Sequence, residues 1–292
     1  MSEAAGFAAG ITDREFEIFR ALVHARTGIA LTPQKRLLLQ SRLAKRLRVL
    51  GLATFTEYHE YLTLRDPGGE EMVHFINGVT THKTEFFREP HHFAYLRDEW
   101  APLKRLRSRR AGDRVLRFWS AACSTGEEAY SIAMTLLEAL PEVGEDWDLR
   151  ILASDIDTDV LTHGADGTYG VDQIGPIPPP LRSRYLLRGT GPKAGLVRIR
   201  PSLRGLIVFR RISLLDEPWP IRTRFDAIFC RNALIYFDRP TQARILERLV
   251  GFLKDDGFLM LGHSETVHGL GLELVPVGNT IYRCTRPAEP RA

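Results

Sequence analysis

Two adjacent carboxylates, Glu127 and Glu128, follow a loop of small residues at positions 120–126 and open a predicted helix. Small residues let a ligand approach the backbone closely. Dinucleotide-binding loops carry the pattern G-x-G-x-x-G and hold a pyrophosphate at the helix start. This loop lacks the pattern, and its two carboxylates would repel phosphate. It favours a cationic ligand without phosphate, such as S-adenosylmethionine, although one of the two acids could serve only to complement the helix dipole.

Asp155 follows the next strand-like run, residues 149–154. An acid at the end of the second strand of a doubly wound sheet accepts hydrogen bonds from ribose hydroxyl groups. Because dinucleotide enzymes share this feature, Asp155 favours S-adenosylmethionine only in combination with the acidic loop.

Two further side chains are candidates for catalysis. Arg88 follows a pair of phenylalanines, and its planar guanidinium could hold a carboxylate of the substrate or of the cofactor. Tyr236 follows a predicted strand and could present its ring or hydroxyl group to a transferred methyl group. The alternatives are an interdomain ion pair for Arg88 and a half-buried core aromatic for Tyr236.

The chain from about residue 113 onward alternates strand-like and helical runs. This alternation predicts an α/β fold with a parallel, Rossmann-like doubly wound sheet that is covered by helices on both faces. Ligands of such sheets bind at the carboxyl ends of the strands, where the acidic loop and Asp155 lie. The predicted strands are residues 114–122, 149–154, 225–230 and 257–262, and the predicted helices are residues 127–140, 158–165 and 240–253.

Residues 181–212 interrupt this alternation. They contain two short β-rich runs, residues 196–200 and 206–210, which are surrounded by glycines and prolines. The pattern predicts a small antiparallel β subdomain inserted into the larger domain.

The first 83 residues predict an N-terminal all-α domain with one basic helix. Capping boxes at Thr12 and Thr54 mark two helix starts, and Thr32 followed by Pro33 marks a third. The helix after Pro33 has leucines on one side and lies in a basic run, residues 33–50, that contains no acid. A binding face for an acidic partner and a solvated helix face are equally open interpretations of this run.

Five short segments stand in an order and spacing that is highly specific as a set. They are Thr-Glu-Phe-Phe-Arg-Glu at 84–89, Trp-Ser-Ala-Ala-Cys-Ser-Thr-Gly-Glu-Glu at 119–128, Ser-Asp-Ile-Asp at 154–157, Phe-Cys-Arg-Asn at 229–232 with Ile-Tyr-Phe at 235–237, and Gly-His-Ser-Glu at 262–265. Together they resemble the chemotaxis receptor glutamate O-methyltransferases, the CheR family, over about residues 11–284.

The resemblance implies that S-adenosylmethionine donates a methyl group to receptor glutamates, giving glutamyl methyl esters and S-adenosylhomocysteine. It also implies a helical domain at residues 1–83, a linker and first catalytic helix at 84–112, and a methyltransferase domain at 113–292 that contains the β subdomain at 181–212. Arg88 and Tyr236 are the expected catalytic residues. The expected cofactor-binding residues are His82, Thr84, Arg88, Ala121, Glu128, Asp155, Ser213, Leu214, Asn232 and Ala233.

Two of these positions depart from the family. His82 and Ser213 stand where the family often has asparagine, and both side chains can still form hydrogen bonds.

The resemblance also gives the basic helix a partner. Receptors of this family have long, glutamate-rich coiled coils in their cytoplasmic regions, so we expect Arg42, Lys45 and Arg46 to bind the substrate. In some members the β subdomain docks a peptide from the receptor's C-terminus by adding a strand to a sheet edge. The compact loop at residues 188–198 resembles those members.

Composition narrows the class of protein. The charged fraction of 26% and hydrophobic fraction of 44% are ordinary for a globular protein. The apolar runs fall far short of the ~20 residues that a membrane helix needs, and residues 1–10 do not resemble a signal peptide. We therefore expect a cytoplasmic protein that does not insert into the membrane. The cysteines and the adjacent His91 and His92 lack ligand spacing, so we expect no metal site.

Two rival functions remain open. A nucleic-acid methyltransferase would explain the basic runs, but the catalytic half lacks a base-flipping motif such as Pro-Pro-Tyr, and we expect no nucleic acid partner. A non-catalytic scaffold that binds S-adenosylmethionine would not consume it, and the intact motif from Thr84 to Arg88 argues against that function.

Overall fold

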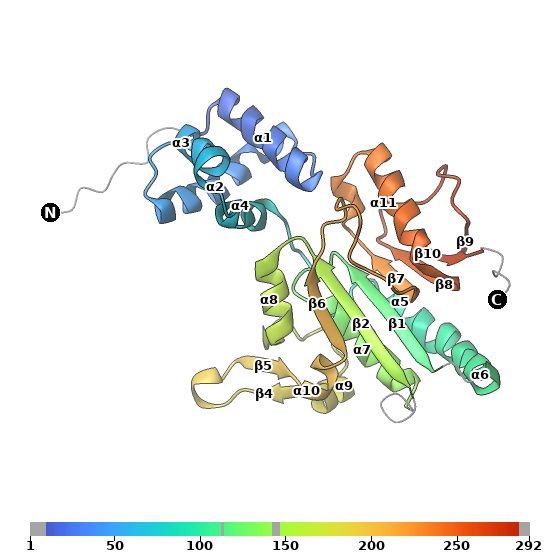
Figure 1. The fold of residues 1–292 in the computed structure, drawn as a ribbon. Coiled ribbons are helices and arrows are strands. Elements are labelled where there is room, and N and C mark those ends of the chain that lie inside the picture. Colours follow the sequence, from blue (N-terminus) through green and yellow to red (C-terminus); the bar gives the residue numbers. More distant parts are fainter. Residues whose placement is uncertain (1–9, 112–113, 142–146, 286–292) are drawn as a thin grey trace.

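The computed structural model describes residues 10–111, 114–141 and 147–285. The outer ends of the predicted domains, residues 1–9 and 286–292, and the boundary residues 112–113 lie outside these ranges. A domain of helices precedes a larger domain built around one sheet (Figure 1).

The helical domain packs around aromatic and leucine side chains. Its elements are α1 (Asp13–Thr27), the 3-10 turn η1 (Pro33–Lys35), α2 (Arg36–Leu50), α3 (Phe55–Glu60), the π-helical η2 (Tyr61–Arg65) and α4 (Glu70–Val79). Phe19, Leu43, Tyr58 and Phe75 are fully buried in its core. The capping boxes predicted at Thr12 and Thr54 are both confirmed.

The start of the basic helix differs from the prediction. Thr32 makes no side-chain capping bond, Pro33 opens the short turn η1, and α2 begins only at Arg36. Proline fits the first position of a 3-10 turn as well as that of an α-helix, so the sequence signal did not distinguish the two.

The larger domain contains a seven-stranded sheet in the order β6-β2-β1-β7-β8-β10-β9. The first five strands in this order are parallel. At one edge β10 pairs antiparallel with β8, and β9 pairs antiparallel with β10. The strands are β1 (Val115–Ala121), β2 (Asp148–Asp155), β6 (Ile207–Arg211), β7 (Phe225–Cys230), β8 (Leu253–Leu261), β9 (Leu274–Gly278) and β10 (Ile281–Cys284).

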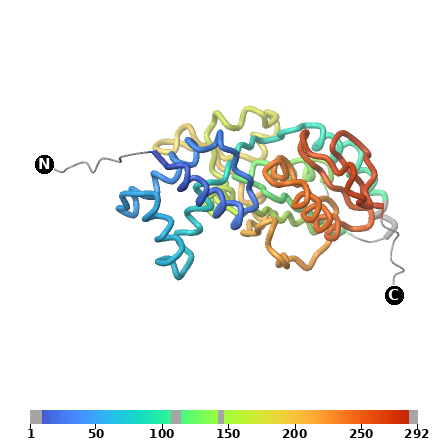
Figure 2. Tube along the Cα trace, turned by 90° about the horizontal axis from the view of Figure 1, so that it is seen from above, coloured from blue at the N-terminus to red at the C-terminus, as the bar shows by residue number. Residues whose placement is uncertain are grey.

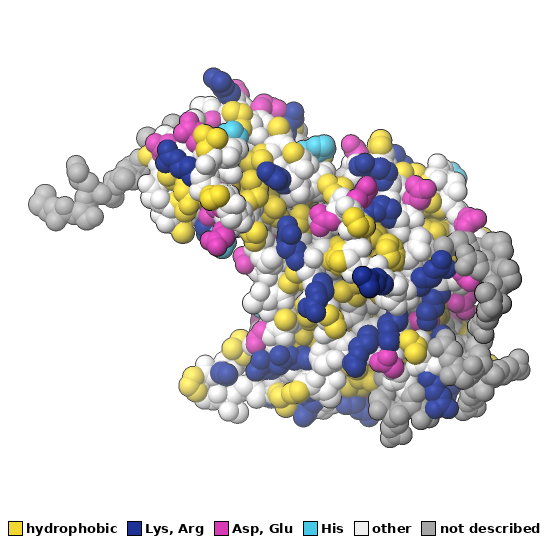
Figure 3. Space-filling model, viewed as in Figure 1, with side chains coloured by type: hydrophobic (Ala, Val, Ile, Leu, Met, Phe, Trp, Pro, Cys, Tyr) yellow, Lys and Arg dark blue, Asp and Glu magenta, His cyan; other side chains and the backbone are white. Residues whose placement is uncertain are grey.

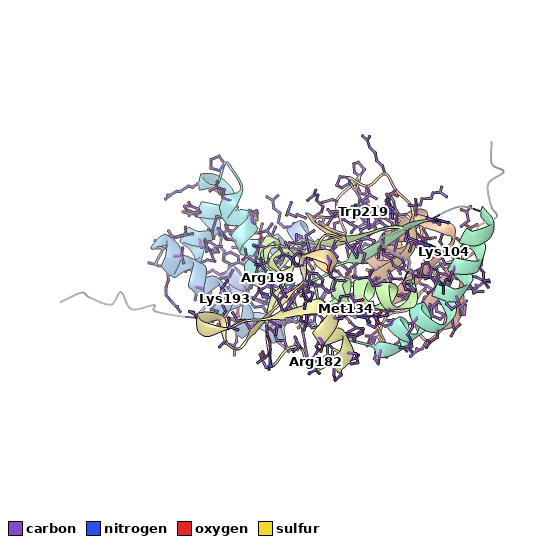
Figure 4. All side chains as sticks on the ribbon, turned by 90° about the horizontal axis from the view of Figure 1, so that it is seen from below. Lys104, Met134, Arg182, Lys193, Arg198 and Trp219 are labelled. Atoms are coloured by element: carbon purple, nitrogen blue, oxygen red, sulfur yellow. The ribbon has the colours of Figure 1, made fainter. Side chains whose placement is uncertain are left out.

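Helices cover both faces of this sheet, as predicted. Alternation along β1 sends Phe118 into one core layer and Trp119 into the other. Met134 belongs to the first layer and Trp219 to the second, and both are labelled in Figure 4. The covering helices are α5 (Pro90–Tyr95), the π-helical η3 (Leu96–Trp100), α6 (Ala101–Ala111), α7 (Glu127–Ala139), α8 (Thr158–Asp166) and α11 (Arg239–Gly251).

The inserted antiparallel sheet is confirmed, but its predicted boundaries, 181–212, need correction. Its strand order is β3-β5-β4, and it begins earlier, at β3. The second predicted run, residues 206–210, lies in the main sheet instead, as β6 parallel to β2. A short run between glycines shows a strand but not the sheet that it joins. The inserted elements are β3 (Thr168–Gly170), α9 (Pro179–Tyr185), β4 (Leu186–Arg188), η4 (Gly191–Lys193), β5 (Leu196–Ile199) and α10 (Pro201–Arg204).

Specific polar contacts join the two domains. The side-chain amide of Asn77 donates to the Thr158 hydroxyl at 2.9 Å, and the Thr80 hydroxyl donates to Asp157 at 2.9 Å. The backbone N–H of Ala30 donates to the carbonyl of Tyr236 at 3.0 Å. Figure 2 shows the N-terminal helices at one end of the molecule and the C-terminal strands at the other. No helix in the described part of the chain is long and apolar enough to cross a membrane.

Candidate active site

A pocket of about 330 Å³ lies at the carboxyl ends of β1, β2 and β7. Its volume falls in the range of small-molecule sites. The helical domain contributes one wall, through side chains that include Lys35 and Leu38, and the segment between the domains contributes another, from Val79 to Arg88. The position is that predicted for the ligand of a doubly wound sheet.

The backbone around this pocket is unusually constrained. Of the six non-glycine residues with positive φ among the described residues, five lie here: Ala122 (62°), Ser124 (51°) and Asn232 (58°) line the pocket, and Phe87 (54°) and Glu89 (58°) flank Arg88. The sixth, Thr280 (54°), lies between β9 and β10. Such conformations cost free energy and cluster at functional sites. Their gathering supports a ligand-binding role for the pocket.

Asp155 is a buried acid at the end of β2. Its Oδ2 accepts a hydrogen bond from the Ser124 N–H at 2.9 Å, and its Oδ1 accepts one from the Asp157 N–H at 3.1 Å. Burial raises the pKa of Asp155, and nearby His82 opposes that rise. The two backbone donors fix the carboxylate in the pocket wall, where its remaining lone pairs can accept hydrogen bonds.

The two acids of the first loop have different surroundings. Glu128 lines the pocket, with Oε1 accepting from the Ser120 hydroxyl at 2.5 Å and Oε2 from Nε of Arg231 at 2.6 Å. Glu127 is not among the lining residues, and its carboxylate accepts a hydrogen bond from Thr125 at 2.6 Å. Of the two acids, Glu128 is therefore the one that can contact a ligand.

All but one of the predicted cofactor-binding residues meet in this pocket. Ala121 is the exception: it is fully buried at the end of β1, and the next residue, Ala122, lines the pocket instead. The resemblance implied Ala121, and its contact with the cofactor stays a prediction. The predicted residues that line the pocket are His82, Thr84, Arg88, Glu128, Asp155, Ser213, Leu214, Asn232 and Ala233.

The two departures from the family pattern have defined contacts. Nε2 of His82 lies 2.7 Å from both the Thr80 hydroxyl and Oδ2 of Asp157, and this contact helps to hold the pKa of Asp157 below its usual value. The Ser213 hydroxyl accepts from the Leu215 N–H at 3.2 Å. Both side chains therefore shape the pocket wall through hydrogen bonds.

Arg88 and Tyr236, the predicted catalytic residues, are both half-buried and line the same pocket. Nη1 of Arg88 donates to the carbonyl of Lys83 at 2.8 Å. The ammonium of Lys35 lies 5.3 Å from the centre of the Tyr236 ring, within cation–π range. Sequence reasoning missed Lys35 and Leu38, because only the tertiary fold brings the helical domain against Tyr236.

The predicted substrate-binding residues of α2 have unequal exposure. Nη1 of Arg42 donates to the carbonyls of Val79 and Thr80 at 2.7 Å each. Arg46 forms a two-pronged ion pair with buried Glu71, at 2.9 and 2.5 Å. These two guanidinium groups hold the helical domain together, whereas Lys45 is exposed.

The side chains of His91 and His92 lie close together. The expectation that adjacent side chains point apart is wrong here, since the two ring centres are only 4.0 Å from each other. Within the described residues, Glu89 and both histidines offer ligand atoms within 4.8 Å of one another. However, Nδ1 of His92 accepts a hydrogen bond from Arg231 at 3.0 Å, and that guanidinium charge opposes a bound cation.

S-Adenosylmethionine fits the chemistry of this pocket. Buried Glu128 and Asp155 supply negative charge and hydrogen-bond acceptors for its ammonium, sulfonium and ribose groups. The first loop bears acids at the helix start, where a phosphate would need donors.

Comparisons with known proteins agree with this assignment. The family profile described as "CheR methyltransferase, SAM binding domain" matches residues 82–282, and "CheR methyltransferase, all-alpha domain" matches residues 14–80. The chain is 47% identical to "Chemotaxis protein methyltransferase 2" of Pseudomonas aeruginosa, covering 93% of each chain. It is 42% identical to "Chemotaxis protein methyltransferase" of Escherichia coli, covering 94% of this chain and 92% of the relative. The chain therefore belongs to the CheR family of S-adenosylmethionine-dependent methyltransferases.

Proposed function

We propose that this protein methylates glutamate side chains in the cytoplasmic region of chemoreceptors, forming glutamyl methyl esters in the cytoplasm. The observation that carries the proposal is that the cofactor pocket has a second wall, which the helical domain provides through Lys35 and Leu38. A protein acceptor bound to that domain would lie beside the methyl donor. The names of the relatives, chemotaxis protein methyltransferases, supply the pathway.

A carboxylate acceptor suits the residues at the pocket. When bound, S-adenosylmethionine supplies an electrophilic methyl group: an acceptor oxygen bonds to the methyl carbon while the carbon–sulfur bond breaks and its electron pair stays on sulfur. Glutamate is ionised at pH 7 and needs no general base. Arg88 and Lys35 offer positive charge to orient the acceptor carboxylate, and Tyr236 provides an adjacent aromatic wall.

The exposed side of α2 is suited to a helical, acidic partner. Leu37 is 76% exposed and Leu38, which also lines the pocket, is 44% exposed, while Lys45 is exposed about two helical turns further along the chain. A coiled-coil receptor helix could place apolar residues on the two leucines and glutamates near Lys35 and Lys45. Because Arg42 and Arg46 are engaged internally, we assign receptor contact chiefly to the lysines and leucines.

The small sheet is a second receptor contact in this proposal. Its outer strand β4 carries exposed Leu187, and basic residues including Lys193 and Arg198 lie on the same hairpin (Figure 4). Figure 3 shows basic side chains gathered over this sheet and β6. An extended receptor tail peptide could add a strand at this edge. A pull-down with receptor tail peptides tests the contact, and no binding at high peptide concentration would remove it.

The chemistry is tested with methyl-labelled S-adenosylmethionine and receptor-containing membranes, followed by mild base. Label released from the receptor band as methanol is the expected result, since carboxyl methyl esters are base-labile. Arg88→Met is expected to abolish the release, whereas Arg97→Met, at an exposed arginine on η3, should preserve it. Cofactor binding without transfer to receptor would instead indicate the non-catalytic scaffold, and transfer to nucleic acid would indicate the other rival.

A further inference from the structure

Arg231 is a buried charge in the pocket wall, at the residue that follows β7. Its side chain is only 2% exposed. Nε donates to Oε2 of Glu128 at 2.6 Å, and Nη1 donates to the backbone carbonyl of Arg88 at 2.6 Å. One guanidinium therefore bonds both to the acid of the first loop and to the segment that carries Arg88.

The third partner of Arg231 is His92, which is completely buried. Burial and the adjacent guanidinium lower the pKa of His92 to about 2, so the imidazole is neutral. Arginine has only donors, so Nδ1 of His92 must be the acceptor in its 3.0 Å contact with Nη1 of Arg231. Nε2 then carries the proton and donates to the Thr280 hydroxyl at 3.0 Å, which itself donates to the carbonyl of Asn279.

Aromatic rings complete the surroundings of this guanidinium. It lies 5.5 Å from the centre of the Phe93 ring and 5.8 Å from that of Phe229. Both contacts are within cation–π range, and the apolar walls strengthen the charged hydrogen bonds. Oε2 of Glu89, which has no hydrogen-bond partner in the described part of the chain, lies 3.6 Å from Nη1 and adds a second negative charge.

These contacts fix two features that the cofactor would meet. Ser120 holds one oxygen of Glu128 and Arg231 holds the other, so the carboxylate has one orientation in the pocket wall. The bond to the Arg88 carbonyl lies between Phe87 and Glu89, two residues held in left-handed backbone conformations. Such conformations persist only where surrounding contacts enforce them.

We propose that Arg231 is a positioning residue of the cofactor site, which orients the carboxylate of Glu128 and the backbone of Arg88 without reacting itself. A lysine at this position would keep the charge, but its single ammonium lacks the planar fork that reaches Glu128, His92 and the Arg88 carbonyl together. The inference concerns cofactor binding and does not depend on the identity of the methyl acceptor.

The test is the affinity for S-adenosylhomocysteine, measured by calorimetry with no acceptor present. Arg231→Lys is expected to weaken binding by about 10- to 100-fold, because charged hydrogen bonds are lost. Arg244→Lys, at an exposed arginine on α11, is the matched control and should bind like the unsubstituted protein. A general loss of structure would lower the affinity without the coupling to Glu128 that the double-substitution cycle measures. Affinity of Arg231→Lys within about twofold of the control would overturn the proposal.

A double-substitution cycle tests the route through Glu128. If Arg231 acts by orienting that carboxylate, Glu128→Gln should weaken binding less in the Arg231→Lys background than alone. If the two substitutions instead weaken binding by independent factors that multiply in the double variant, the proposal is overturned. Should Arg231→Lys fail to fold, Glu128→Gln provides the second test, because it keeps the shape of the side chain and removes the charge that Arg231 orients. A loss of more than about tenfold in affinity is expected for Glu128→Gln, and an affinity within about twofold of the control would contradict the proposal.

Discussion

Replacing Asp155 by asparagine should separate cofactor binding from folding stability. The carboxylate is fixed by the N–H groups of Ser124 and Asp157 and lines the pocket. Asparagine keeps the shape but removes the charge and one acceptor oxygen. Hydrogen bonds to a charged group contribute about 1.5–3 kcal/mol each, so the loss of one corresponds to about a 10- to 150-fold higher Kd for S-adenosylhomocysteine.

The expected effect of Asp155→Asn on stability is much smaller, because two contributions oppose each other. Burial raises the pKa of Asp155, so the ionised form destabilises the folded state at neutral pH and asparagine removes that cost. Against this, one of the two backbone N–H groups loses its acceptor. We expect the free energy of unfolding to change by less than about 1 kcal/mol, which limits the Tm shift to less than about 4 °C.

Calorimetric titration with S-adenosylhomocysteine and thermal melting together check this prediction. Asp159→Asn is the matched control: Asp159 is exposed in the first turn of α8, and its substitution should leave the affinity unchanged. An affinity of Asp155→Asn equal to that of the control would refute the assignment of Asp155 to the cofactor site. A large loss of Tm with unchanged affinity would make Asp155 a structural residue.

Three further predictions concern packing and charge. A Cβ atom at Gly262 would lie 2.4 Å from Nδ2 of Asn232, so Gly262→Ala should weaken S-adenosylhomocysteine binding. Gly251→Ala should not, because a Cβ there meets no described atom within 4 Å, and equal affinities of the two variants in calorimetric titration would contradict this prediction. Arg46→Ala removes the ion pair of buried Glu71, which then keeps only the hydrogen bond from the Tyr58 hydroxyl among its described side-chain partners. The substitution should lower the free energy of unfolding by about 2–4 kcal/mol in urea melts, against less than about 0.5 kcal/mol for exposed Lys45→Ala. In the folded protein His92 stays neutral down to about pH 2, whereas in the unfolded chain it is protonated below about pH 6.5, so lowering the pH below 6.5 favours unfolding. His92→Asn should reduce this loss of unfolding free energy by about 1.4 kcal/mol per pH unit. Parallel plots of unfolding free energy against pH for the two proteins would contradict the prediction.

Local sequence signals predicted much of the fold and a few residues of the pocket, whereas the resemblance to the CheR family implied the others. Glu128 and Asp155 could be placed because each follows a strand, and the carboxyl ends of parallel strands meet at one edge of a sheet. The capping boxes at Thr12 and Thr54 depend on residues only three positions apart, so they too could be read from the sequence.

Features that depend on distant parts of the chain could not be read in this way. β6 joins the main sheet through pairing with β2, more than fifty residues earlier in the chain. The engagement of Arg46 depends on Glu71 in another helix, and Lys35 reaches the pocket only because the helical domain packs against Tyr236. Arg231 belongs to the motif Phe-Cys-Arg-Asn, but its partners come from two distant segments, residues 88–92 and the start of α7. Tertiary packing decides such contacts.

We propose above that the methyl acceptor is a glutamate carboxylate of a chemoreceptor. The most direct test of this proposal is to locate the transferred methyl group by peptide-level mass spectrometry, after receptor is incubated with this protein and S-adenosylmethionine that carries a deuterated methyl group. We predict deuterated methyl esters on glutamate side chains in the receptor's cytoplasmic region, absent with Arg88→Met. Label on lysine, arginine or nucleic acid, or consumption of the cofactor without labelled glutamate in the receptor, would contradict the claim.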